Sequence, residues 1–501
     1  MAKIKQTQKL EAALFSAADK LRKNIDAAEY KHIVLGLVFL KYISDSFESL
    51  HKELLSQNED AEDKDEYIAK NIFFVPQDSR WSALLSKAKS PQIGKDLDYA
   101  LDLIEKDNPQ LKGVLPKVYA KDNLDSATLG DLINLIDSIS LNQENTSDIL
   151  GHIFEYFLGE FALSEGKKGG QFYTPKSVVE LLVAMLEPYN GRVFDPCCGS
   201  GGMFVQSERF VREHQGKISD ISIYGQESNQ TTWRLAKMNL ALRKIDSSSL
   251  KWNSEGSFLN DAHKDLKADF IIANPPFNAT DWGSQALEND VRWQYGTPPS
   301  TNANYAWISH FIHHLAPKGR AGFVLAKGSL TSNTSTEGQI RKNLIESNLI
   351  ECIVNLPAKL FLNTQIPACL WFIKRNKSHN NTLFIDARSL GELINRKNRI
   401  LTQSDIAKIT ETYHKWQKAQ EQQSGEYSDI LGFCKSVSKE EIANLGYVLT
   451  PGRYVGLAED DEDFDFEREF TRLKAELESQ IKEERILSEK ILNNLEIIGG
   501  K

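Results

Sequence analysis

One asparagine, two prolines and a phenylalanine stand directly after a short apolar segment in the middle of the chain. The segment is FIIA at 270–273, and Asn274, Pro275, Pro276 and Phe277 follow it. Proline has a fixed φ angle and no backbone N–H, so the pair holds the Asn274 amide oxygen and the Pro275 carbonyl as rigid hydrogen-bond acceptors. Two acceptors side by side match an NH2 group on a planar ring, and Phe277 offers a face on which that ring could stack. We therefore expect these four residues to be catalytic and to act on an amine.

Bonding of this kind also explains how such an amine could react. When both N–H groups are donated to fixed acceptors, electron density moves toward the nitrogen, which can then attack a methyl sulfonium. Holding the amine and the methyl group in line can supply roughly 7–11 kcal/mol of the barrier. The proton can leave after the attack, so the motif needs no strong base beside it.

A glycine-rich turn upstream has the features of a cofactor loop. The strand-like RVFD ends at Asp195 and is followed by Gly199, Ser200, Gly201 and Gly202. Glycine allows the backbone to approach a ligand closely, and in a doubly wound sheet the ligand lies at the carboxyl ends of the strands. The spacing matches neither GxGxxG nor GxxxxGK[ST], which excludes a dinucleotide fingerprint and a P-loop. Taken alone, the loop could also be an ordinary tight turn.

Three acids complete the predicted cofactor site. Asp195 could hold an ammonium group, and Glu227, at the end of the next strand-like segment, could accept bonds from ribose hydroxyls. Asp261 stands at the third such position, where it could meet an adenine amine, and a simple turn residue is the alternative there. No cationic residue in the loop could meet a pyrophosphate. These features favour S-adenosylmethionine over a phosphate-bearing cofactor.

The elements that must position these residues change in character along the chain. Residues 1–150 carry apolar residues at helical spacing and predict a helical domain. Residues 151–456 alternate strand-like segments with amphipathic helices, which predicts an α/β catalytic domain with a doubly wound, mostly parallel, seven-stranded sheet. The seven segments are RVFDP, SIYGQE, DFIIANPP, RAGFVLA, IECIVNLP, CLWFIKR and TLFIDAR. Only NKSHNN joins Cys369–Arg375 to Thr382–Arg388, so we expect these last two strands to form an antiparallel hairpin.

Residues 457–501 are predicted to form an acidic linker and a charged C-terminal helix. The apolar residues of this helix recur every three to four positions with one gap, close to a heptad. They are Phe470, Leu473, Leu477, Ile481, Leu487, Ile491 and Leu495. A narrow apolar stripe on a charged helix favours packing against another helix, either in a partner protein or in the chain's own domain.

Composition restricts the function further. The chain has 501 residues and a formal net charge of −9, so broad DNA contact would need a local basic channel or a partner. Its five cysteines show no CxxC or Cys/His ligand spacing, so we expect buried thiols, no disulfide framework and no metal site. The apolar segment IVLGLVFL is too short to span a bilayer, and the N-terminus lacks the features of a signal peptide. Both observations favour a cytoplasmic protein without membrane contact.

These motifs resemble those of the modification subunits of type I restriction-modification systems, which methylate DNA adenine at N6. DPCCGSGGMF resembles the cofactor loop of that family, and NPPF resembles its catalytic motif. GGQFYTP at 169–175 resembles the segment that closes over the cofactor. YKHIVLGLVFLKYISDSFE resembles the family's N-terminal helical domain, and LTPGRYV at 449–455 resembles a late signature before the tail helix. The likeness covers nearly the whole chain, with the doubled Cys197-Cys198 as a mild departure.

The resemblance implies further contacts and partners. It extends the cofactor site to Gln171, Phe172, Tyr173, Thr174, Pro175 and Lys176. It implies that the target adenine is flipped out of the duplex and held by Phe277, with Tyr173 as a second aromatic. It also implies a separate specificity subunit that sets the DNA sequence and binds two modification subunits, and a third subunit for translocation and cleavage.

Two alternatives remain open at this point. A methyltransferase that acts on a protein glutamine or an RNA base would carry the same amine-binding motif, although the helical N-terminus and the tail helix favour the type I family. A catalytically silent assembly scaffold would keep the fold alone. The intact Asp195, Glu227 and Asn274 argue against that scaffold.

Overall fold

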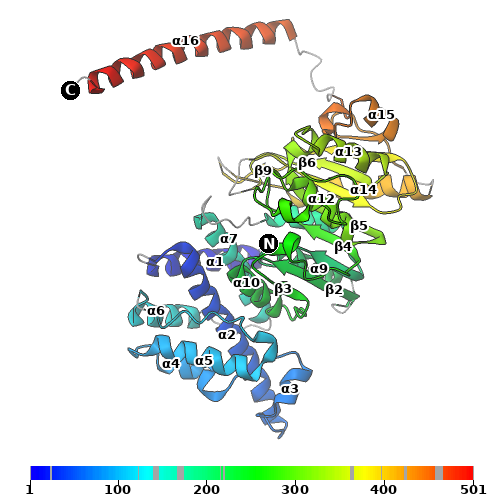
Figure 1. Ribbon diagram of the computed structural model, residues 1–501. Helices are drawn as coiled ribbons and strands as arrows, with labels where there is room; N and C mark the ends of the chain where they lie inside the picture. Colours follow the sequence, from blue (N-terminus) through cyan, green and yellow to red (C-terminus); the bar gives the residue numbers. More distant parts are fainter. Residues whose placement is uncertain are drawn as a thin grey trace. The chain divides into compact units, whose positions relative to one another are not determined.

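The structure is a computed structural model composed of two compact units, Met1–Val455 and Gly456–Lys501 (Figure 1). It describes residues 2–22, 25–121, 123–138, 146–165, 174–214, 216–217, 220–361, 366–395, 398–422, 426–456 and 466–499.

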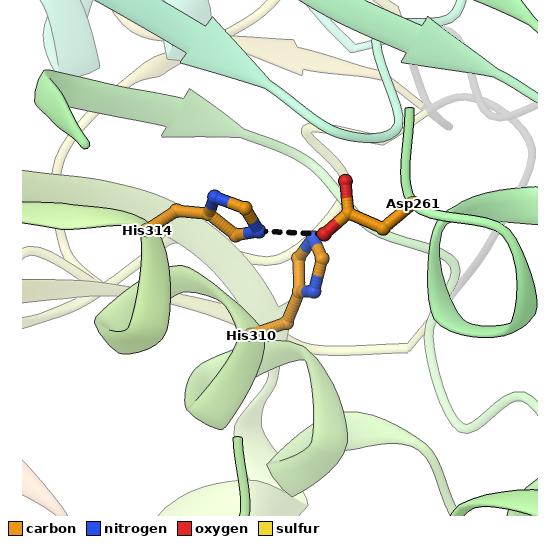
Figure 2. A group of neighbouring side chains, drawn as sticks. All are labelled: Asp261, His310 and His314. Carbon is orange, nitrogen blue, oxygen red and sulfur yellow. Dashed lines mark hydrogen bonds and ion pairs between the residues drawn. The ribbon is translucent and has the colours of Figure 1, made fainter. Parts of the chain in front are cut away.

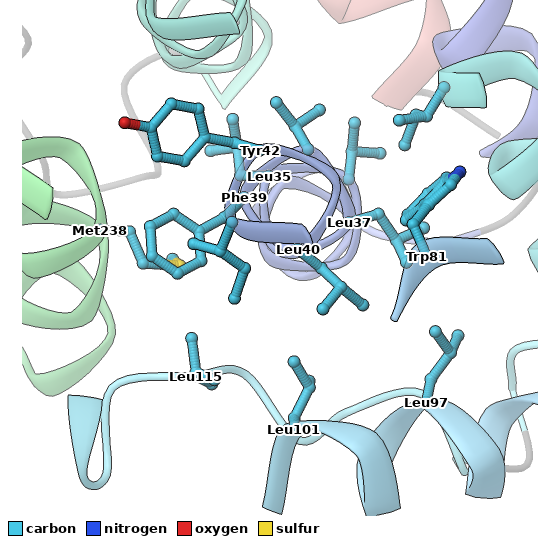
Figure 3. Packing of buried hydrophobic residues seen from close by; sticks show 14 of the residues in the cluster. Leu35, Leu37, Phe39, Leu40, Tyr42, Trp81, Leu97, Leu101, Leu115 and Met238 are labelled. Carbon is cyan, nitrogen blue, oxygen red and sulfur yellow. The ribbon is translucent and has the colours of Figure 1, made fainter. Parts of the chain in front are cut away.

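The first part of the larger unit is helical, as predicted. Its helices are α1 (Ala2–Leu21), α2 (Ala27–Ser56), α3 (Lys64–Ala69), α4 (Trp81–Ser86), α5 (Ile93–Asp107), α6 (Ser126–Asp137) and α7 (Thr146–Glu165). α2 carries apolar residues around most of its circumference, so it lies at the centre of one core (Figure 3). Trp81 of α4, Leu97 of α5 and Met238 of a later helix, α10 (Gln230–Ala241), pack around it. Through α10 the helical part is joined to the α/β part.

The α/β part contains a single large sheet of nine strands within the described ranges, in the order β11-β8-β6-β7-β5-β4-β1-β2-β3. The strands are β1 (Gly191–Asp195), β2 (Ile221–Glu227), β3 (Leu250–Trp252), β4 (Ala268–Ala273), β5 (Leu315–Ala326), β6 (Ile350–Asn355), β7 (Ala368–Lys374), β8 (Asn381–Asp386) and β11 (Cys434–Ser438). β9 (Glu392–Leu393) and β10 (Arg399–Ile400) form a separate small sheet. The predicted mostly parallel α/β sheet is confirmed, but its strand count is nine instead of seven. β3 and β11 were missed because LKW and CKSVS lack a clear apolar pattern.

The predicted hairpin between the last two apolar strands is wrong. β7 lies between β5 and β6 and is antiparallel to both, whereas β8 lies on the far side of β6 and is parallel to it. Six of the seven residues of β7 are buried, which suits a central strand with a neighbour on each edge. The NKSHNN link crosses the start of β6, where the Lys377 ammonium donates to the Ile350 carbonyl at 2.6 Å.

Helices cover both faces of the sheet because successive strand residues point to opposite sides. Val193 and Ile272 belong to a core that contains side chains of α8, α9 and α14, and Phe194 and Ile271 belong to a core that contains side chains of α12, α13 and α15. The remaining helices are α8 (Lys176–Leu186), α9 (Gly202–Glu213), α11 (Gly256–Leu259), α12 (Asn304–His314), α13 (Glu337–Glu346), α14 (Gln403–Gln422) and α15 (Lys439–Asn444). Short 3-10 helices span Gln77–Ser79, Pro109–Leu111, Ser284–Leu287, Lys327–Leu330 and Pro451–Arg453.

The second unit is the helix α16 (Phe466–Gly499), as the sequence predicts. Its apolar stripe is exposed at Phe470, Leu473, Leu477, Ile481, Leu487 and Ile491, and the side chain of Leu495 lies outside the described residues. None of the helices in the described ranges combines the length and apolar character that a bilayer crossing requires. All five cysteines are free thiols, four of them buried and Cys197 half-buried.

Candidate functional site

Three adjacent strands end at one edge of the sheet and bring the predicted side chains together. β1 lies between β4 and β2 and is parallel to both, with Asp195 opposite Gly225 of β2. Asp195 is the last residue of β1, Glu227 is the last residue of β2, and Asn274 directly follows β4. The chain continues from β1 to β2 and β3 on one side and then returns to β4 on the other side of β1. α/β sheets bind ligands where the strand order reverses in this way.

The loop between β1 and α9 has a backbone that needs glycine. Gly199 and Gly201 have φ angles of 54° and 79°, in the left-handed region. The Gly199 N–H donates to Glu227 Oε2 at 3.0 Å, and the Asn239 amide of α10 donates to the Ser200 carbonyl at 2.8 Å. These bonds fix the loop against β2 and α10.

Two cavities open at this edge and meet at the loop. Their volumes are about 490 Å3 and about 60 Å3, and Cys197, Gly199, Ser200 and Asn274 line both. The other predicted residues that line one of them are Thr174, Lys176, Asp195, Gly202, Glu227 and Pro276. A Cβ atom added at Gly202 would meet no atom within 4 Å, so the backbone there borders open space.

The two carboxylates at the strand ends accept hydrogen bonds from backbone amides, and Asp195 is buried whereas Glu227 is half-buried. Asp195 accepts from the Cys197 N–H at 3.0 Å, and burial raises the pKa of Asp195 to about 7. Glu227 accepts from the Gly199 N–H and from the Asn229 N–H at 2.8 Å, and burial also raises the pKa of Glu227. The ionised form of each group would be stabilised by a cationic or hydrogen-bond-donating ligand.

Asn274 has one half of its amide bonded and the other half without a partner. Its Nδ2 donates to the Thr174 hydroxyl at 2.8 Å, whereas its buried Oδ1 accepts no hydrogen bond from any described residue. An unsatisfied buried acceptor costs about 1–3 kcal/mol. Asn274 lines both cavities, so a ligand that enters them would lie beside this side chain.

The turn after Asn274 is fixed by a reciprocal pair of bonds to the start of α12. The Asn278 N–H donates to Asn304 Oδ1 at 3.0 Å, and the Asn304 amide donates to Asn278 Oδ1 at 2.8 Å. The Ala303 N–H donates to the Ala279 carbonyl at 2.9 Å. Asn304 is buried and Asn278 is exposed, so these bonds tie an exposed turn to the buried start of α12.

The other members of the NPPF motif point in different directions. Pro276 is exposed and lines the larger cavity, and Pro275 is buried. Phe277 is 9% exposed and lines neither of the two cavities, so its stacking role stays a prediction. It packs edge-on against Phe361 with the ring centroids 5.9 Å apart, because the turn directs its ring into the apolar core beside α8.

Several residues that sequence reasoning missed line the larger cavity. They are Lys31, Leu158, Ser228, Asn229, Thr232, Leu235, Glu255, Gly256, Ser257, Phe258, Leu259, Ala279, Thr280, Asp281, Trp282 and Trp307. Ser228 and Asn229 directly follow Glu227, so their place at a strand end could have identified them. The ring centroid of Phe258 lies 4.3 Å from that of Trp307 and 5.2 Å from that of Trp282. These three residues are distant in sequence, so no local sequence pattern could have predicted that they line one cavity.

Asp261 is not brought to the cavities. Its Oδ1 accepts from the His263 N–H at 2.8 Å, and its Oδ2 lies 2.9 Å from His314 Nε2. The loop turns this carboxylate toward α12, and Asp261 lines neither cavity, so its contact with adenine stays a prediction. Gln171, Phe172 and Tyr173 lie outside the described residues, and Pro175 immediately precedes α8.

Comparisons with known proteins give a consistent result. The family model described as N-6 DNA Methylase matches residues 145–463, and the model of the HsdM N-terminal domain matches residues 10–136. The Type I restriction enzyme HindI methylase subunit of Haemophilus influenzae is 47% identical, over 85% of this chain and 100% of its own length. The MjaIX methylase subunit of Methanocaldococcus jannaschii is 38% identical, over 98% of this chain and 92% of its own. A crystal structure of the type I restriction-modification system methyltransferase subunit from Streptococcus thermophilus has a TM-score of 0.78 and 27% identity, and the match covers 90% of this chain and 100% of that one.

Proposed function

The chain belongs to the N-6 DNA methylase family, and from this premise we infer that it methylates adenine in DNA at N6, as the modification subunit of a type I restriction-modification enzyme. Its relatives at 47% and 38% identity are methylase subunits of type I restriction enzymes. The structural observation that carries the chemistry is the buried Asn274 oxygen, which has no partner among the described residues at the wall shared by two cavities.

The proposed role of the chain is to hold the amine of a flipped-out adenine. Asn274 Oδ1 accepts one N–H of that amine, and the Pro275 carbonyl accepts the other. Thr174 fixes the orientation of the Asn274 amide through the bond at 2.8 Å, so the acceptor is in place before the base enters. When bound, S-adenosylmethionine supplies the methyl group from its sulfonium, and the electron pair of the broken S–C bond stays on sulfur. The methylated nitrogen then loses one proton to solvent.

The residues at the strand ends suit S-adenosylmethionine because two of them carry carboxylates and the glycine loop leaves room for a ligand. We propose that Asp195 pairs with the ammonium group and that Glu227 accepts bonds from the ribose hydroxyls. Gly199 and Gly202 border open space, since a Cβ on either would meet no atom within 4 Å. We propose that the aromatic wall at Phe258, which lines the larger cavity, borders the adenine in place of Asp261, and that 171–173 cover the cofactor.

We extend the proposal to the partners and the domain organisation. Residues 1–150 form the helical domain, 151–456 the catalytic domain, and 457–501 the linker and docking helix. A separate specificity subunit sets the DNA sequence and binds two copies of this chain, and a third subunit supplies translocation and cleavage. The exposed stripe on α16 supports a helical partner, since exposed apolar residues at heptad-like spacing are stabilised by packing against another helix.

The docking role of α16 is testable by deletion. Removal of 466–501 is expected to leave the melting temperature of the larger unit unchanged and to abolish assembly with the specificity subunit on a sizing column. Leu477→Asp should weaken assembly in the full chain, and Glu478→Gln on the same helix is the matched control. A complex that forms equally well without α16 would show that docking occurs elsewhere.

The substrate class is tested by offering three acceptors to one preparation. The chain with its specificity subunit and labelled S-adenosylmethionine is given duplex DNA, RNA of the same sequence and a glutamine-containing peptide. We expect N6-methyladenine in DNA alone, by mass spectrometry. Label in RNA or peptide would support another amine methyltransferase, and absence of cofactor binding would support a scaffold.

A further inference from the structure

A buried cluster outside the catalytic motifs joins α12 to the loop after α11. Asp261 lies in that loop, and His310 and His314 stand one turn apart on α12 (Figure 2). Both histidines are 0% exposed. The three side chains offer ligand-type atoms within 4.8 Å of one another, so two roles are conceivable: a metal site or a hydrogen-bonded network.

The bonds of His314 require hydrogens on both ring nitrogens. Nε2 lies 2.9 Å from Asp261 Oδ2, and Nδ1 lies 3.0 Å from the Leu266 carbonyl, which can only accept. A carboxylate and a carbonyl together select the imidazolium form. Although burial opposes ionisation of Asp261, the bond from His314 holds the pKa of this carboxyl below its usual range. His314 and Asp261 therefore form a buried ion pair.

The bonds of His310 argue against a metal. A guanidinium can only donate, so the contact of 3.1 Å between Arg292 Nη1 and His310 makes Nδ1 the acceptor. Burial lowers the pKa of His310 well below its usual value, so the ring is neutral and its single hydrogen is on Nε2. Nε2, which has no hydrogen-bond partner among the described residues, then has no lone pair to offer a metal ion. The adjacent positive charge of Arg292 would also oppose a cation.

Arg292 connects this cluster to the wall of the larger cavity. It is 6% exposed and donates to the carbonyls of Ser257 and Phe258 at 3.3 and 2.7 Å. Both residues line the cavity, and the Phe258 ring contacts Trp307 of α12. The other bonds of Arg292 are to Asp290, at 2.7 Å. One helix thus fixes both sides of this wall, directly through Trp307 and indirectly through His310 and Arg292.

We propose that Asp261, His314, His310 and Arg292 form a buried bracket that positions the Ser257–Phe258 wall for the cofactor. The inference rests on the proposed function, since it takes the larger cavity to bind S-adenosylmethionine. These are positioning residues, because none of the four lines the cavity. Their removal should weaken cofactor binding and leave the transfer step, which depends on Asn274, nearly unchanged.

The test separates cofactor affinity from turnover in the full chain. Asp261→Asn and Arg292→Lys are each expected to raise the Kd for S-adenosylmethionine about tenfold by calorimetry, with kcat at saturating cofactor within about twofold of the wild type. Glu351→Gln is the matched control, because Glu351 is a buried carboxylate bonded to Tyr413 that does not line either cavity. It should lower the melting temperature without changing the Kd.

Substitutions of His310 test the same bracket if Asp261→Asn or Arg292→Lys fails to fold. His310→Asn retains an acceptor near Nδ1 and should bind the cofactor more tightly than His310→Leu. Equal, wild-type affinity in both folded variants would overturn the bracket. A stoichiometric divalent metal in the purified wild type, lost in both variants, would replace it by a metal site. Failure of the wild type to bind S-adenosylmethionine would instead refute the proposed function itself.

Discussion

Asp195 and Glu227 accept hydrogen bonds from backbone N–H groups, whereas the buried Oδ1 of Asn274 accepts none from any described residue. All three stand at the same edge of the sheet, at or just beyond the ends of neighbouring strands. The two carboxylates proposed to bind the cofactor thus already accept hydrogen bonds from the protein backbone. Asn274, proposed to bind the target amine, has an acceptor oxygen without a partner among the described residues, and its Nδ2 donates to Thr174.

This difference indicates how the two sides act. Carboxylates that already accept backbone bonds remain in place when a ligand leaves, so we expect Asp195 and Glu227 to serve binding. An unsatisfied oxygen is stabilised only when a donor arrives, so it favours the bound amine in the geometry of reaction. Changes on the cofactor side should therefore affect affinity and methylation together, and a change at Asn274 should affect methylation alone.

The largest effect on the cofactor side is expected from Gly202→Val. A Cβ at this position would meet no atom of the protein within 4 Å, so we expect folding to be little affected. We expect a loss of about 100-fold in cofactor affinity, or about 2.7 kcal/mol, by calorimetry. Gly328→Val is the matched control, since its Cβ also meets no atom and it lines neither cavity. Cofactor affinity that survives Gly202→Val would place the cofactor elsewhere.

A smaller effect on the same side should appear as a pH dependence. Burial raises the pKa of Asp195 to about 7, so the carboxyl is ionised above that pH and protonated below it. Only the ionised form can pair with an ammonium group. The Kd for S-adenosylmethionine should therefore rise as pH falls below 7, by up to about tenfold per pH unit. Asp195→Asn should bind more weakly with no such dependence, and an unchanged pH profile would remove Asp195 from the ammonium site.

The smallest effect is expected on the target side, from Thr174→Val. The substitution removes the partner of Asn274 Nδ2, so the amide can rotate and its oxygen is less well placed. Methylation at saturating cofactor should fall about three- to tenfold, of the order of one hydrogen bond, whether or not the cofactor Kd also changes. Thr410→Val, which alters a buried hydroxyl on α14 without a hydrogen-bond partner among the described residues, should have no effect on methylation.

Local patterns predicted the parts of the site that are continuous in sequence. Asp195, Glu227 and Asn274 could be identified because each follows a short apolar strand, and the glycine loop because its conformation requires glycine. The order of the strands could not be predicted, since β7 is inserted between β5 and β6 by contacts distant in sequence. Contacts distant in sequence also decide two side-chain orientations that local patterns could not predict. The Asp261 carboxylate is oriented by its contact with His314, and the Phe277 ring packs against Phe361. The aromatic wall around Phe258 forms only when α12 approaches the loop.

The most direct measurement compares methylation and cofactor binding in Asn274→Ala, in complex with the specificity subunit. We expect N6-methyladenine formation to fall by about 100- to 1,000-fold, the effect of removing one preorganised group at a reacting centre. The Kd for S-adenosylmethionine should stay within about threefold of the wild type, because we propose that the amide contacts the base and not the cofactor. Methylation at the wild-type rate, or an equal loss of cofactor binding, would contradict the assignment of this oxygen to the target amine.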